Sequence, residues 1–254
     1  ANYTISREEV LQREPNLKSD KLLGAGVYLD YVNNDARLVI ENIKEADELG
    51  GLMASHVKVV GVLHDDNGRI NGVKAKDLLT DEEFEIKAKM VINTTGPWVT
   101  KTLGLDDKNG EGEVIRPTKG VHLVVDSSRL RVPQPTYFDS GIGDGRMIFV
   151  VPRENKTYFG TTDTDYTGDY KHPRVEQADV DYLLKAINNR YPEAEITIND
   201  IEASWAGLRP LLSGNGSSDY NGGGSNTGKV SDESFENLIK TAVAYSKDEA
   251  SRGE

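Results

Sequence analysis

The sequence of 254 residues contains no cysteine. Disulfide frameworks, thiolate catalysis and cysteine-ligated zinc are therefore excluded. No apolar run approaches the ~20 residues of a bilayer-spanning helix, and the first six residues lack the features of a signal peptide. Neither G-x-S-x-G nor H-E-x-x-H occurs, so the common hydrolase motifs have no support. We therefore expect a cytoplasmic protein with no transmembrane segment.

Positive charge is outnumbered by negative charge. Thirty Lys and Arg face 42 Asp and Glu, which gives a net charge of −12 and a pI near 4.9. This balance argues against nucleic-acid binding and against a basic membrane-surface patch. It does not exclude an anionic substrate, because a few buried arginines can set the local field whatever the net charge.

The first part of the chain alternates helix and strand signals. Ser6 with Glu9 forms a capping box for a short helix that stops at Pro15. An edge strand is expected within Leu22 to Tyr31. Asp35 is then expected to cap a helix that ends at the glycine pair Gly50 and Gly51.

A β-rich region follows. Residues 56–63 and 70–79 flank the hairpin signal Asn67-Gly68, and residues 84–89 continue the meander. The apolar run 90–93 is expected to be a further short strand.

The second part of the chain predicts an antiparallel sheet and one long helix. A hairpin tip is expected at Gly141 to Gly145. The expected elements are strands 121–125, 147–151, 157–161 and 196–205, and a helix 176–190. The fold class is thus α+β, with a mostly antiparallel β-sheet flanked by helices. Residues 213–230 have the Gly/Ser/Asn composition of a flexible linker, and residues 231–254 predict an amphipathic helix capped by Ser231.

Two side chains are candidates for chemistry. His122 follows Lys119 near a strand start, where an imidazole can take the proton of an alcohol. A hydrogen-bonded core histidine explains the same pattern. Arg209, between Gly207 and Pro210, suits a bidentate phosphate contact, and an ordinary salt bridge is the alternative.

The segment Gly160 to Asp165 is either a ligand loop or a solvated turn. Its carboxylates lack the spacing of a calcium loop, so we predict no metal site.

Five short motifs follow one another along the chain: Asp35–Leu38 (D-A-R-L), Val91–Trp98, Lys119–His122 (K-G-x-H), Gly160–Asp163 (G-T-T-D) and Gly207–Leu211 (G-x-R-P-L). Their order resembles one family, the FAD-dependent glycerol-3-phosphate oxidases and dehydrogenases. Val91–Trp98 is similar to the family's "I-N-A-T-G-P-W", with Thr94 in place of the commoner alanine. The stretch after residue 212 is similar to an insertion of the streptococcal-type α-glycerophosphate oxidases.

The resemblance implies a substrate domain over an FAD domain assembled from discontinuous, Rossmann-like segments. Residues 1–110 would be partial FAD-domain segments with the β-meander, and residues 111–212 the substrate-binding domain. His122 would accept the substrate proton, and Arg209 and Lys119 would bind substrate. The residues implied on the FAD side are Val57, Thr94, Thr95, Gly96 and Trp98.

The implied reaction oxidises sn-glycerol 3-phosphate to dihydroxyacetone phosphate, reduces FAD, and passes the electrons to O2 to give hydrogen peroxide. The chain lacks both G-x-G-x-x-G and the family's later G-G-K-x-T-x-Y-R segment. We therefore expect a fragment of a longer flavoprotein that neither retains FAD tightly nor turns over alone.

Two alternatives stay open: a non-enzymatic module that binds an anionic metabolite or partner, and an amino-acid oxidase of the same flavoprotein superfamily. The residues leave quinone open as acceptor and do not determine the oligomeric state.

Overall fold

The computed structural model describes residues 2–108 and 115–212. The chain divides into two compact units, Ala1–Gly112 and Glu113–Glu254, and each is described by itself. Within the described ranges, every helix is too short or too polar to cross a bilayer. The linker and helix predicted for residues 213–254 lie outside the described residues.

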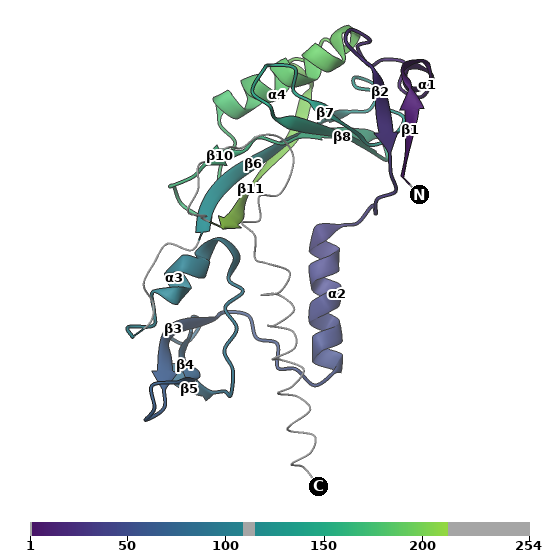
Figure 1. Cartoon of the computed structure of the whole chain (residues 1–254). Helices are drawn as coiled ribbons and strands as arrows, with labels where there is room; N and C mark the ends of the chain where they lie inside the picture. Colours follow the sequence, from purple (N-terminus) through teal and green to yellow (C-terminus); the bar gives the residue numbers. More distant parts are fainter. Residues whose placement is uncertain (1, 109–114, 213–254) are drawn as a thin grey trace. The chain divides into compact units, whose positions relative to one another are not determined.

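The first unit contains two small antiparallel sheets and two longer helices (Figure 1). Its elements are β1 (Tyr3–Ser6), α1 (Arg7–Arg13), β2 (Gly24–Val27), α2 (Asp35–Glu48), β3 (Val57–His64), β4 (Ile70–Asp77), β5 (Glu83–Lys87), η1 (Gly96–Trp98) and α3 (Val99–Leu103). Strand β1, which the sequence pattern did not predict, pairs with β2.

Both predicted helices of this unit form. The Ser6 side chain accepts a hydrogen bond from the Glu9 backbone N–H at 3.3 Å, so the predicted cap of α1 is confirmed. The predicted cap of α2 is wrong by one residue. Asn34 is the cap and accepts from the Arg37 N–H, while Asp35 is already helical. An uncharged Asx side chain fulfils the same requirement for an acceptor at the helix start.

The predicted meander is confirmed as the antiparallel sheet β3-β4-β5. At its first turn Gly68 adopts φ +79°, and the Asp65 carboxylate accepts from the N–H groups of Asn67 and Arg69. The Asn-Gly signal therefore works through a left-handed glycine.

The strand expected at residues 90–93 does not form. Met90 and Ile92 are 46% and 71% exposed, and the described residues offer this segment no strand partner. An apolar run becomes a strand only when neighbouring strands satisfy its backbone N–H and C=O groups.

The second unit is one antiparallel sheet with a long helix (Figure 1). Its elements are β6 (Ile115–Asp126), β7 (Thr136–Asp139), β8 (Met147–Arg153), β9 (Lys156–Gly160), β10 (Thr164–Asp165), α4 (Gln177–Arg190), η2 (Pro192–Ala194), η3 (Ile198–Asp200) and β11 (Ile201–Leu212). Strand β6 is central, with β11 on one side and β9 and β10 on the other. Strands β8 and β7 continue beyond β9. The predicted mostly antiparallel sheet is confirmed.

The core lies between one face of this sheet and α4. Val121, Leu123 and Val125 alternate along β6 and are fully buried, as are Leu183 and Ile187 of α4. The residues of β6 that alternate with these, including His122, point to the other face of the sheet. The period-2 pattern thus decides which side chains are left for a site.

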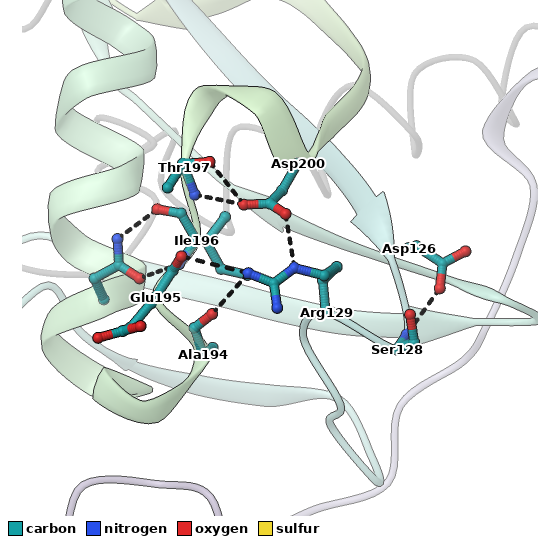
Figure 2. A network of polar contacts seen from close by, with 9 residues as sticks. Asp126, Ser128, Arg129, Ala194, Glu195, Ile196, Thr197 and Asp200 are labelled. Carbon is teal, nitrogen blue, oxygen red and sulfur yellow. Dashed lines mark hydrogen bonds and ion pairs between the residues drawn. The ribbon is translucent and has the colours of Figure 1, made fainter.

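A network of polar contacts holds the loop after β6 to the segment before β11 (Figure 2). Arg129 Nε donates to the Asp200 carboxylate at 2.6 Å, and its Nη2 donates to the Ala194 and Glu195 carbonyls. This guanidinium, followed by the Thr197 N–H and hydroxyl, lowers the pKa of Asp200 to about 2.

The same network corrects the predicted strand 196–205. Thr197 and Asp200 form a reciprocal cap around the 3-10 turn η3, so β11 begins only at Ile201 and extends to Leu212. A capping-box pattern of this kind competes with strand formation for the same backbone groups.

Candidate functional site

The site lies on the sheet face opposite α4. Directly paired residues of antiparallel strands share a face, and one such row crosses five strands. Trp205 of β11 pairs with His122 of β6, which pairs with Gly160 of β9. Phe149 of β8 and then Tyr137 of β7 complete the row. Trp205, Phe149 and Tyr137 of this row are each at least 36% exposed.

His122 occupies the centre of this row. Its ring stacks on the Trp205 ring with 4.8 Å between centroids and 14° between planes, and the Tyr158 ring meets it edge-on at 5.9 Å. Burial, and then the nearby positive charge of Arg209, lower the pKa of His122 to about 4. The imidazole is therefore neutral at neutral pH and can accept a proton.

Two glycines make room for the functional side chains. A Cβ at Gly160 would lie 2.6 Å from His122 Cδ2, and a Cβ at Gly120 would lie 2.4 Å from Arg209 Nη1. Any side chain at either position would displace the imidazole or the guanidinium. The glycines of the K-G-x-H and G-T-T-D motifs thus have a steric role.

Arg209 is held by the segment that follows β9. Its Nη2 donates to Thr161 Oγ1 at 2.8 Å and its Nη1 to the Thr162 carbonyl at 3.3 Å, with an Asp163 carboxylate oxygen 3.5 Å from Nη1. The Arg209 side chain is nevertheless 36% exposed. Since a guanidinium carries five N–H donors, donors remain for an anion.

The segment at Thr162 is also fixed to β6. The Val121 N–H donates to Thr162 Oγ1 at 3.1 Å, and that hydroxyl donates to the Lys119 carbonyl at 3.4 Å. Between the end of β9 and the start of β10, the Thr162 hydroxyl thus takes the place of backbone hydrogen bonds to β6. The segment expected to be a ligand loop or a solvated turn is therefore a support for Arg209.

Lys119 points away from this face. Its ammonium lies 2.7 Å from Asp179 and 3.1 Å from Glu176, and it donates to the Arg174 carbonyl. Its side chain is only 3% exposed. This placement joins β6 to the start of α4 and favours a packing role over the predicted substrate contact.

The residues implied on the FAD side belong to the first unit. Thr94, Thr95, Gly96 and Trp98 lie together at the turn η1, whereas Val57 begins β3. Gly96 has φ +54°, and a Cβ there would meet no atom within 4 Å, so its backbone is open to an approaching flat ligand. Thr95 Oγ1 donates a hydrogen bond to the Asn93 side-chain oxygen and lies 3.0 Å from Thr102 Oγ1. The open backbone at Gly96 is thus the part of this turn that a ligand could approach.

Sequence reasoning missed Trp205 and Tyr158 as neighbours of His122. Trp205, Gly207 and Arg209 are at alternate positions of β11 and so share one face of the sheet, which could have placed Trp205 on the same face as Arg209. Tyr158 became a neighbour only through the pairing of β9 with β6. No group of three His, Asp or Glu suited to a metal ion occurs in the described part of the chain.

Comparison with known proteins gives matches over most of the chain. A family model described as FAD dependent oxidoreductase matches residues 1–234. This chain is 64% identical to the alpha-glycerophosphate oxidase of Streptococcus pneumoniae serotype 4 over 252 residues, and 63% identical to that of Enterococcus casseliflavus over 251 residues. Each match covers 99% of this chain. The chain spans 41% of the length of these curated relatives.

A solved structure extends the match to the fold. The glycerol-3-phosphate dehydrogenase from Bacillus halodurans complexed with FAD superposes with a TM-score of 0.75 and 45% identity. The superposition covers 83% of this chain and 42% of that one. The chain therefore belongs to the FAD dependent oxidoreductase family.

Proposed function

We propose that this chain carries the substrate-binding sheet of a flavoprotein that oxidises sn-glycerol 3-phosphate to dihydroxyacetone phosphate. The observation that carries the proposal is the pairing of a neutral imidazole and a guanidinium on one sheet face, each fitted against a glycine. The relatives named alpha-glycerophosphate oxidase support the choice of substrate.

In this proposal His122 accepts the proton of the substrate hydroxyl. A base must be unprotonated before it acts, and the lowered pKa keeps His122 in that form. Its neighbour Arg209 stabilises negative charge on the same face, which suits a phosphate ester. A single carboxylate, as in an amino acid, would use fewer of its donors.

When bound, FAD supplies the acceptor for the hydride that leaves the substrate carbon. Thr94, Thr95, Gly96, Trp98 and Val57 would hold it. O2 as the final electron acceptor belongs to the same proposal, supported by the oxidase names of the relatives. A cytoplasmic location belongs to the same proposal.

The test is a flavin absorbance spectrum of the purified chain after incubation with FAD, repeated with sn-glycerol 3-phosphate without oxygen. In parallel, calorimetry measures binding of sn-glycerol 3-phosphate to the chain and to Arg209→Ala, with Arg153→Ala, at the end of β8, as the matched control.

We expect little retained flavin, measurable substrate binding, and at least a tenfold weaker affinity in Arg209→Ala only. Bound flavin that bleaches with substrate would support the proposed reaction but contradict the expected loss of FAD. No binding of substrate, or equal weakening in both variants, would overturn the proposal for this sheet.

A further inference from the structure

The His122 ring is held in an unusual way for a proton acceptor. Imidazoles with a chemical role are commonly oriented by a hydrogen bond from the second ring nitrogen to a carboxylate or carbonyl. Within the described residues, neither ring nitrogen of His122 has such a partner, and its contacts are to aromatic rings. The orientation of the ring must therefore come from packing.

Trp205 is the closer of the two aromatic neighbours of His122, with 4.8 Å between ring centroids against 5.9 Å for Tyr158. It lies directly across from His122 in the register of β11 and β6, and its plane is 14° from that of the imidazole. Tyr158 contacts both rings, with 5.5 Å between its centroid and that of Trp205. On the β9 side, Gly160 leaves room only for the edge of the imidazole. The ring is thus confined between an indole and a backbone.

The exposure of Trp205 needs a reason. It is 46% exposed on the open sheet face and contributes little to the core against α4. A large aromatic side chain in such a place is unexplained by burial alone, because a small polar residue would serve a solvated strand position equally well.

We propose that Trp205 is a positioning residue that fixes the imidazole of His122 by ring stacking, in place of a hydrogen-bonded partner. The consequence for catalysis rests on the proposed function, whereas the positioning itself does not. Stacking also shields the ring from water. The charged and titratable groups near it are Arg209 on β11, Asp163 after β9 and Tyr158 on β9, and Lys119 of β6 lies on the opposite face.

The experiment is imidazole NMR on the isotope-labelled chain. The sequence has only four histidines, so four ring spin systems are expected. The variants are Trp205→Leu, which removes the stacked ring, and Trp205→Phe, which keeps a smaller one. Phe149→Leu is the matched control, since Phe149 lies in the same row beyond Gly160 and its ring contact is to Tyr137. The exposed His172 serves as an internal reference.

We expect the ring protons of His122 to be shifted upfield by the indole relative to His172. Trp205→Leu should abolish this shift and raise the pKa of His122 toward its ordinary value of 6.5, because burial is the larger cause of the lowered pKa and the indole supplies part of that burial. Trp205→Phe should keep part of the ring shift, and Phe149→Leu should change neither quantity.

An unchanged His122 ring shift and pKa in a folded Trp205→Leu chain would overturn the proposal. If that variant does not fold, Trp205→Phe decides alone: an intermediate ring shift supports stacking, and an unchanged one contradicts it. Failure of sn-glycerol 3-phosphate to bind, with the ring shifts as expected, would overturn the proposed function and leave the positioning role intact.

Discussion

The two units of this chain bury their apolar side chains to very different extents. In the second unit, buried residues on β6, β8, β9 and α4 form a continuous core. In the described residues of the first unit the buried apolar side chains are few: Val10, Leu63, Val73 and Ala75. Its helix α2 buries no residue, although Val39, Ile40 and Ile43 give it an apolar face.

The difference shows that a local sequence pattern specifies a helix but does not supply the tertiary contacts that bury its apolar face. Periodicity and caps are enough to form α2, but its apolar face stays exposed unless another segment covers it. Two of the segments with exposed apolar side chains, α2 and residues 90–93, overlap the motifs Asp35–Leu38 and Val91–Trp98 that resemble the FAD domain. The second unit instead closes its core within one sheet and one helix.

The largest expected effect tests this contrast directly. Phe159→Ala, at a fully buried position of β9, should lower the free energy of unfolding by about 3–5 kcal/mol. Ile40→Ala, at a position 51% exposed on α2, should change it by less than about 0.5 kcal/mol. Urea unfolding followed by tryptophan fluorescence measures both.

The two tryptophans allow each unit to be followed alone. Trp98 lies in the first unit and Trp205 in the second, so a Trp98→Phe background reports on the second unit. Equal losses of stability for Phe159→Ala and Ile40→Ala would show that the units do not differ as described.

The sequence predicted the antiparallel sheet, the meander and α4, because alternation and turn residues act locally. It gave His122 as a candidate proton acceptor and Arg209 as a candidate phosphate contact. It did not predict that Trp205 and Tyr158 lie beside the imidazole. That proximity depends on strand register, which is a long-range property. The start of β6 was missed because Lys119 interrupts the apolar alternation, and only a partner on α4 makes a lysine acceptable there.

Lys119 therefore gives the second prediction. Lys119→Met would leave the buried Asp179 carboxylate without its cation and should cost about 3 kcal/mol of stability. Adding Asp179→Asn, which keeps an acceptor for the Glu176 N–H, should recover at least half of that loss. Urea midpoints of the single and double variants measure this.

The matched comparison is Lys76→Met in the first unit, where the partner Asp81 is 83% exposed. That change should cost less than about 1 kcal/mol. A double variant no more stable than Lys119→Met would mean that the lysine acts through its aliphatic stem rather than its charge.

The smallest of the three effects is a pH dependence confined to the second unit. The folded chain holds the pKa of His122 at about 4, against an ordinary value of 6.5, so between these values the unfolded chain binds a proton that the folded chain does not. Stability of the second unit should therefore fall as pH falls from 6.5 to 4, by roughly 2–3 kcal/mol for a shift of this size. Urea unfolding of the Trp98→Phe chain at a series of pH values measures it.

His122→Gln should abolish this slope, because it keeps a polar side chain at the position and removes the titration. The carboxylates of Asp200 and Asp126, with pKa values of about 2, contribute stability that is lost only as pH falls below about 4, so their effect lies outside this window. A slope between pH 6.5 and 4 that persists in His122→Gln would assign it to another group. A slope that disappears ties the stability of the second unit to the same neutral imidazole that the proposed reaction requires.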